Sequence, residues 1–145
     1  MRVPYSLPFI NDDVINEVND VFNNTGWLTS GPKVLEFEKE IQKITKSKNV
    51  VCVNSWTSGL IAAVGAIGIE PGDEVICPNL TFIAPVNMIA LTGAKPVLVD
   101  IEPNSWAIDH TLVAEAITER TKAIVIVHLY GFACDFTKII KFHNS

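Results

Sequence analysis

The first third of the chain places apolar residues at helical spacing between polar ones. From residue 12 to residue 22 the apolar positions are Val14, Ile15, Val18 and Phe22. Asn11 stands just before this segment and can cap a helix through its side-chain oxygen. The same periodicity recurs from residue 34 to residue 44. The pattern therefore predicts two amphipathic helices at the start of the chain.

The rest of the chain alternates short apolar runs with helical patterns. The apolar runs predict strands at residues 50–53, 75–77, 97–99 and 123–127. The periodic segments predict helices at residues 57–67, 81–91 and 108–117, and a last helix that begins at Asp135. Such alternation predicts an α/β fold with a largely parallel sheet. In these sheets ligands bind where strands end and helices begin.

One of these junctions has the composition of an anion site. Residues 54–59 join an apolar run to a helix of small residues, and they include the hydroxyls of Ser55, Thr57 and Ser58. A helix start has unpaired backbone N–H groups and a partial positive charge, which suit a dianionic phosphate. The alternative is that Ser55 or Thr57 is an ordinary helix cap. The segment has neither a Walker lysine nor a Rossmann glycine triplet, so the sequence does not support nucleotide binding by those routes.

The composition narrows the class of protein. The 145 residues are 48% hydrophobic and 19% charged, with a net charge of −5, which is typical of a globular chain. No basic cluster points to nucleic acid, and no apolar run reaches the length of a membrane span. Nothing resembles a signal peptide, so we expect a cytoplasmic protein. Cys52, Cys77 and Cys134 form no CxxC pair, and we therefore expect no metal site.

Several motifs, taken in order, resemble the DegT/StrS (DegT/DnrJ/EryC-type) family of sugar aminotransferases. The matching runs are Gly26-Trp27-Leu28-Thr29-Ser30-Gly31-Pro32-Lys33-Val34, Val53-Asn54-Ser55-Trp56-Thr57-Ser58-Gly59-Leu60, Gly68-Ile69-Glu70-Pro71-Gly72-Asp73-Glu74-Val75-Ile76, Gly93-Ala94-Lys95-Pro96-Val97 and Val127-His128-Leu129-Tyr130-Gly131. Each motif alone is weak, but their shared order along almost the whole chain is specific.

The resemblance implies the fold and the cofactor. The expected fold is that of PLP-dependent transferases of fold type I, with an incomplete large domain like that of aspartate aminotransferase. Residues 1–145 would form the N-terminal segment and part of that PLP-binding domain, with the C-terminal small domain absent. Ser55, Trp56 and Thr57 would form the phosphate loop of pyridoxal 5'-phosphate (PLP), and Phe82 would stack on its ring. In the absence of the resemblance, Phe82 reads as a core aromatic.

The resemblance also implies a reaction. The substrate would be a nucleotide-linked keto-sugar, the amino donor glutamate or glutamine, and the enzyme a homodimer. The lysine that forms the Schiff base with PLP is expected beyond the point that matches Ser145. The lysines within the second half of the chain do not match its motif; they are Lys95, Lys122, Lys138 and Lys141. We therefore assign no catalytic residue within these 145 positions.

Two alternatives remain open at this stage. The first is a PLP-dependent sugar dehydratase of the same family, in which a histidine replaces the Schiff-base lysine. The second is a truncated, non-catalytic chain that binds a phosphate ligand or a partner subunit.

Other polar residues are expected to be structural. His128 and Tyr130 follow a strand and are predicted to pack beneath the site, whereas His110 is expected at the surface. Asp100 ends a strand and is predicted to hydrogen-bond within the fold. Glu74 belongs to a turn sequence and is expected in solvent.

Overall fold

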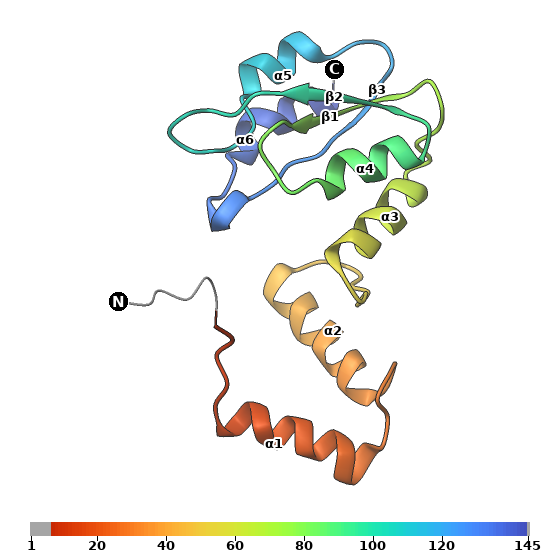
Figure 1. Ribbon diagram of the computed structural model, residues 1–145, viewed down its shortest axis with the longest axis vertical. Helices are drawn as coiled ribbons and strands as arrows, with labels where there is room; N and C mark the ends of the chain where they lie inside the picture. The colour runs from red at the N-terminus through yellow and green to blue at the C-terminus, as the bar shows by residue number, and fades with distance from the viewer. Residues whose placement is uncertain (1–6, 145) are drawn as a thin grey trace. The chain divides into compact units, whose positions relative to one another are not determined.

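The computed structural model describes residues 7–144 of the chain, with the side chains of residues 7–142 (Figure 1). The chain divides into two compact units, Met1–Cys52 and Val53–Ser145. No helix in the described part of the chain is both long and apolar enough to cross a membrane.

The first unit consists of the two predicted amphipathic helices. Helix α1 (Asp12–Asp20) continues into a π-helical turn, η1 (Val21–Thr25), and α2 spans Pro32–Thr45. The predicted cap is confirmed, because Asn11 Oδ1 accepts a hydrogen bond from Val14 N at 3.0 Å. Lys33 Nζ joins the two helices by ion pairs to Glu17 at 2.6 Å and Asp20 at 2.9 Å. No residue of α1 or α2 is buried.

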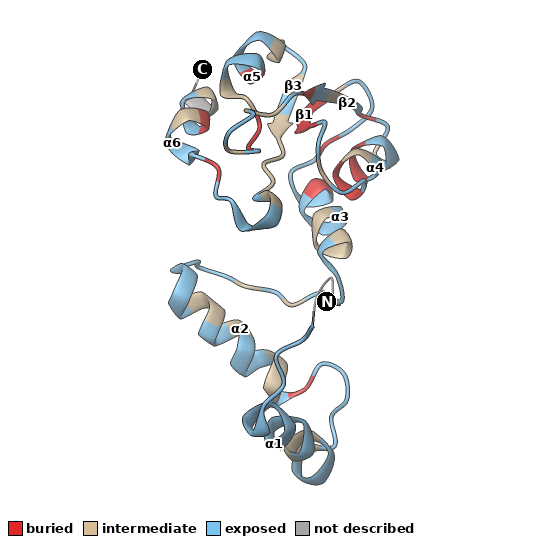
Figure 2. Ribbon diagram, turned by 60° about the vertical axis from the view of Figure 1, so that its left-hand side comes forward, coloured by how far each residue is buried: buried red, intermediate tan, exposed pale blue. Residues whose placement is uncertain are grey.

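The second unit is an α/β body built on a small parallel sheet. Its regular elements are α3 (Trp56–Ala66), β1 (Glu74–Pro78), α4 (Ala84–Leu91), β2 (Lys95–Val99), α5 (His110–Ala116), β3 (Thr121–Ile124), η2 (Leu129–Gly131), α6 (Phe136–Ile139) and η3 (Ile140–Asn144). The strand order is β2-β1-β3, and both pairings are parallel. The predicted architecture is therefore confirmed, and Figure 2 shows buried residues in β1 and α4 among other elements of this unit.

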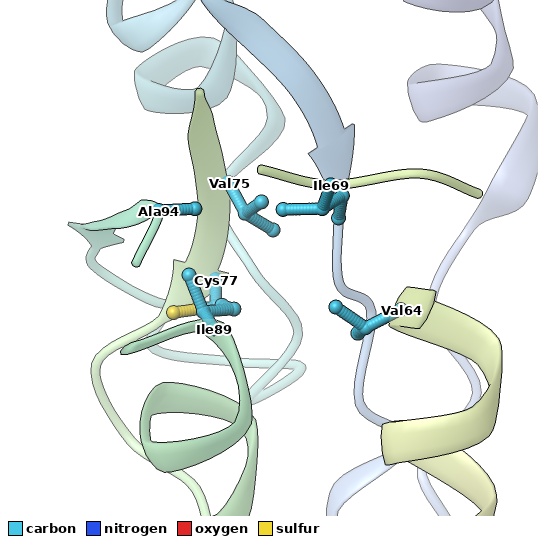
Figure 3. Packing of buried hydrophobic residues seen from close by; sticks show 6 residues of the cluster. All are labelled: Val64, Ile69, Val75, Cys77, Ile89 and Ala94. Carbon is cyan, nitrogen blue, oxygen red and sulfur yellow. The ribbon is translucent and has the colours of Figure 1, made fainter. Parts of the chain in front are cut away.

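The central strand β1 separates two apolar clusters. All five of its residues are buried, and successive side chains point to opposite faces of the sheet. On one face Val75 and Cys77 pack with Val64 of α3 and Ile89 of α4 (Figure 3). On the other face Ile76 packs in a cluster that includes residues of β2, α5 and α6; these are Val99, Val113 and Ile139. Helices on both faces explain why residues 75–77 of β1 form an unbroken apolar run.

Two local predictions are wrong. Residues 50–53 form no strand, and Val51 is 76% exposed. A strand needs a neighbour for its backbone hydrogen bonds, and the sheet in the described residues gives this run none. Helix α4 begins at Ala84 rather than near Thr81, with Ile83 as its cap residue and a proline in its first turn. A proline there suits the helix start, because its missing N–H would have no partner within the helix anyway.

Candidate functional site

The amino-terminal end of α3 is the predicted anion site, and Ser55 is its helix cap. Ser55 has an extended backbone, and its Oγ accepts a hydrogen bond from Ser58 N at 3.1 Å. The two serine hydroxyls also lie 3.0 Å apart, and Gly59 N donates to Ser55 O at 3.1 Å. The hydroxyls of Ser55 and Ser58 are therefore already engaged in closing the first turn.

The donors that remain at this end are those of Trp56 and Thr57. They are the first two residues of α3, where backbone N–H groups have no acceptor within the helix. The positive end of the helix dipole lies at the same place. The Trp56 side chain is 54% exposed, so the bulky indole finds room. These amides, with the hydroxyl of Thr57, fit the needs of a phosphate group.

Phe82 lies in the loop that joins β1 to α4, at the carboxyl end of the central strand. Its side chain is 70% exposed, so it belongs to neither apolar cluster. The first residue of the loop is held to the end of β2, because Asn79 N donates a hydrogen bond to Val99 O at 2.9 Å. Helices α3 and α4, which follow the Ser55 turn and the Phe82 loop, are in contact. The stacking of Phe82 on a cofactor stays a prediction.

In the segment after β3, His128 has a structural role, as expected, whereas the expectation that Tyr130 packs beneath the site is wrong, because Tyr130 is 73% exposed. His128 Nδ1 accepts a hydrogen bond from Cys134 N at 3.0 Å, so a neutral His128 carries its proton on Nε2. Its ring centre is 6.4 Å from that of Phe136. Tyr130 has a left-handed φ of 52° and meets Trp106 edge to face, with the ring centres 5.6 Å apart. Both residues are thus engaged in packing and turn geometry.

The expectation that Glu74 is a solvent residue is wrong. Its side chain is 3% exposed and accepts hydrogen bonds from Thr118 Oγ1 at 2.7 Å, an Arg120 guanidinium N–H at 3.0 Å and Lys95 Nζ at 3.1 Å. These bonds, that from Thr118 first, lower the pKa of Glu74 to about 2. The burial of Glu74 could have been inferred from the parallel register that places Lys95 opposite it. That register, however, requires knowing which strands pair.

A second polar cluster lies between β2 and α6. Glu102 accepts a hydrogen bond from Ser105 Oγ at 2.9 Å, and its carboxylate lies 2.9 Å from His110 Nδ1. His110, which was expected at the surface, is half-buried and paired with Glu102. Asp109 caps α5 by accepting from Thr111 N at 2.8 Å. The nearby Asp100 accepts from Ile101 N at 2.8 Å, as its predicted structural role requires. Each carboxylate here has a local partner.

Two lysines of this unit, Lys95 and Lys138, form ion pairs, and both lie far along the chain from the α3 turn. Lys95 Nζ is 3.1 Å from the buried Glu74 carboxylate, and Lys138 Nζ is 3.6 Å from Glu102. A lysine that attacks a cofactor carbonyl must be free to lose its proton. These pairings agree with leaving both lysines outside the catalytic set.

The DegT/DnrJ/EryC1/StrS aminotransferase family model matches residues 8–145. The chain belongs to this family. Two curated relatives illustrate the match. Spore coat polysaccharide biosynthesis protein SpsC of Bacillus subtilis (strain 168) is 47% identical over 95% of this chain and 35% of its own length. UDP-4-amino-4-deoxy-L-arabinose–oxoglutarate aminotransferase of Shewanella sediminis (strain HAW-EB3) is 42% identical over 94% of this chain and 35% of its own.

Solved structures agree with the family assignment. Spr1654 from Streptococcus pneumoniae, a protein assigned as a sugar aminotransferase, has been solved in its PLP form. It matches with a TM-score of 0.90 and 38% identity, over 97% of this chain and 36% of that one. A GDP-4-keto-6-deoxymannose-3-dehydratase with a trapped PLP-glutamate geminal diamine also matches. Its TM-score is 0.90 and its identity 27%, over 97% of this chain and 38% of that one. The neighbours confirm fold type I and PLP as the family's cofactor.

The chain spans about a third of the length of these relatives. The residues that complete a cofactor site in the relatives can therefore lie in the part that this chain does not match.

Proposed function

We propose that residues 53–145 are part of the PLP-binding domain of an enzyme that transfers an amino group to a nucleotide-linked keto-sugar. Glutamate or glutamine would be the donor, and the enzyme would act in the cytoplasm as a homodimer. The observation that carries the proposal is the amino-terminal turn of α3, where the backbone amides of Trp56 and Thr57 have no acceptor within the helix and would donate to a phosphate group. The names of the relatives supply the sugar-nucleotide and amino-donor chemistry.

The chain's own residues would anchor the cofactor rather than perform chemistry on it. PLP supplies an electron sink for the bonds around the transferred nitrogen. The amides of Trp56 and Thr57 and the Thr57 hydroxyl would donate hydrogen bonds to its phosphate. Phe82, exposed in the loop after the carboxyl end of β1, would cover one face of the pyridine ring and exclude water from it. A lysine and a carboxylate for the pyridine nitrogen would come from outside residues 1–145.

The dehydratase remains the alternative within the family, because the solved dehydratase matches this chain with the same TM-score as Spr1654. The residue at the Schiff-base position separates the two functions. Lysine there favours amino transfer, and histidine favours dehydration. A non-catalytic role in binding a phosphate ligand or a partner is the other alternative.

A chimera tests the proposal directly. This chain replaces the matched third of SpsC, and the purified product is incubated with PLP, glutamate and a panel of keto-sugar nucleotides. We expect an amino-sugar nucleotide and one equivalent of 2-oxoglutarate, detected by mass spectrometry. The unmodified SpsC is the positive control. A chimera that is fully loaded with PLP yet transfers no amino group, while SpsC does, would contradict the proposal.

A further inference from the structure

The hydrogen bonds between Ser55 and Ser58 engage both hydroxyl oxygens but only one of the two hydroxyl protons. Ser58 N donates to Ser55 Oγ at 3.1 Å, and the two hydroxyl oxygens lie 3.0 Å apart. In a hydrogen bond between two hydroxyls, one proton lies between the oxygens and the other is left over. The pair that closes the first turn of α3 therefore retains one O–H group for another acceptor.

Which serine retains this O–H group depends on which hydroxyl donates. A hydroxyl has one proton to donate and two lone pairs that accept. If Ser55 donates to Ser58, Ser55 Oγ keeps an unpaired lone pair at the start of the helix. If Ser58 donates to Ser55, Ser55 Oγ accepts two hydrogen bonds, one from Ser58 N and one from Ser58 Oγ. Both lone pairs of Ser55 are then occupied, and its side chain can act only as a donor.

The second arrangement suits an anion at this turn. Ser55 immediately precedes Trp56 and Thr57, whose backbone amides have no acceptor within the helix. Ser55 is exposed and Ser58 is half-buried, so Ser55 is the more accessible of the two to a ligand. A phosphate repels a lone pair directed at it, whereas it accepts a strong, charge-assisted hydrogen bond from an O–H group. A bound phosphate therefore favours the arrangement in which Ser58 donates.

We propose that Ser58 is a positioning residue for the cofactor phosphate and that it acts through Ser55. The Ser58 hydroxyl donates to Ser55 Oγ and leaves the Ser55 O–H group as a donor to the phosphate, beside the amides and the hydroxyl of Thr57. Ser58 itself does not touch the phosphate. The inference rests on the proposed function, because it takes the α3 turn to bind the phosphate of PLP.

Calorimetric titration of the SpsC chimera with pyridoxamine phosphate tests the role of Ser58. Ser58→Ala should weaken binding by about two- to twelvefold, the value of one hydrogen bond between neutral groups. Ser58→Thr keeps a hydroxyl at this position and should restore the affinity. Pyridoxamine, which lacks the phosphate, is the matched control ligand and should bind Ser58→Ala and the unmodified chimera equally. A residue that only stabilised the helix would instead lower the melting temperature of the apo-protein and weaken both ligands alike.

A double-mutant cycle tests whether Ser58 acts through Ser55. When Ser55→Ala has removed the hydroxyl that Ser58 orients, adding Ser58→Ala should change the affinity for pyridoxamine phosphate by less than about twofold. An undiminished loss in that background would overturn the proposal. So would unchanged affinity in Ser58→Ala alone, or an equal loss of affinity for pyridoxamine.

The result can be separated from the outcome for the proposed reaction. Amino transfer by the chimera without any effect of Ser58→Ala on binding would refute the role of Ser58 alone. The expected effect of Ser58→Ala in a chimera that transfers no amino group would refute the reaction alone. An unmodified chimera that does not bind pyridoxamine phosphate would overturn both.

Discussion

The buried carboxylate of Glu74 at the start of β1 accepts a hydrogen bond from the guanidinium of Arg120, 3.0 Å away and 46 residues later in the chain. Glu74 N also donates to Arg120 O at 2.8 Å. With Thr118 and Lys95 bound to the same carboxylate, this one side chain joins the starts of all three strands.

Replacing Glu74 with glutamine should destabilise the second unit. The variant keeps the shape of the side chain but loses the negative charge that Arg120 and Lys95 share, and buried groups that lose a partner are costly. We expect the melting temperature to fall by several degrees in a thermal unfolding experiment. Glu70→Gln, in the exposed turn just before β1, is the control and should change it little. Equal melting temperatures for both variants would show that the Glu74 contacts contribute nothing.

The stability of the chain should also depend on pH through the same carboxylate. The pKa of Glu74 is lowered from 4.5 to about 2, chiefly by the Thr118 hydrogen bond and then by Arg120. A lowered folded-state pKa stabilises the fold above the unfolded value, and that contribution is lost as the pH falls from about 4.5 through 2. The difference in melting temperature between wild type and Glu74→Gln should therefore shrink over this range. A difference that stays constant from pH 6 to pH 2 would exclude this carboxylate as the cause.

The Ser55 turn allows capping and phosphate binding to be separated. In the SpsC chimera, Thr57→Val should weaken binding of pyridoxamine phosphate by about 10- to 150-fold, the value of a hydrogen bond to a charged group. Ser55→Ala should also destabilise α3 by about 1 kcal/mol, because Ser55 is the cap. Calorimetric titration and thermal melts of the apo-proteins measure the two effects. If Thr57→Val lowered only the melting temperature, Thr57 would not be a phosphate ligand.

The isolated chain should form no specific covalent adduct with PLP. Its Lys95 and Lys138 are ion-paired, and none of its lysines matches the family's Schiff-base motif. After incubation with PLP and borohydride reduction, peptide mass spectrometry should find only scattered, substoichiometric labelling of lysines. SpsC treated identically should carry one stoichiometric adduct. A single-site, stoichiometric adduct in the isolated chain would contradict our assignment of the catalytic lysine to sequence outside it.

Three helix caps could be predicted from local sequence, although the predicted start of α4 near Thr81 was wrong, and contacts between distant segments could not be predicted. Asn11, Ser55 and Asp135 cap their helices as side-chain acceptors, because a cap depends only on residues two or three positions away. The run at residues 50–53 has the composition of a strand, but no strand pairs with it among the residues that the structure describes. Glu74 looked like a solvent residue because its partners lie 21, 44 and 46 positions away. The α3 turn was predictable from a short motif.

The sequence separation between Glu74 and Arg120 has a consequence during synthesis on the ribosome. At roughly 5–20 residues per second, the second neighbour of β1 emerges about 2–9 seconds after Glu74 itself. Until then the nascent chain exposes an apolar strand that begins with a carboxylate without its arginine. That interval is when a chaperone would have access to β1, and slower translation across residues 75–120 would lengthen it.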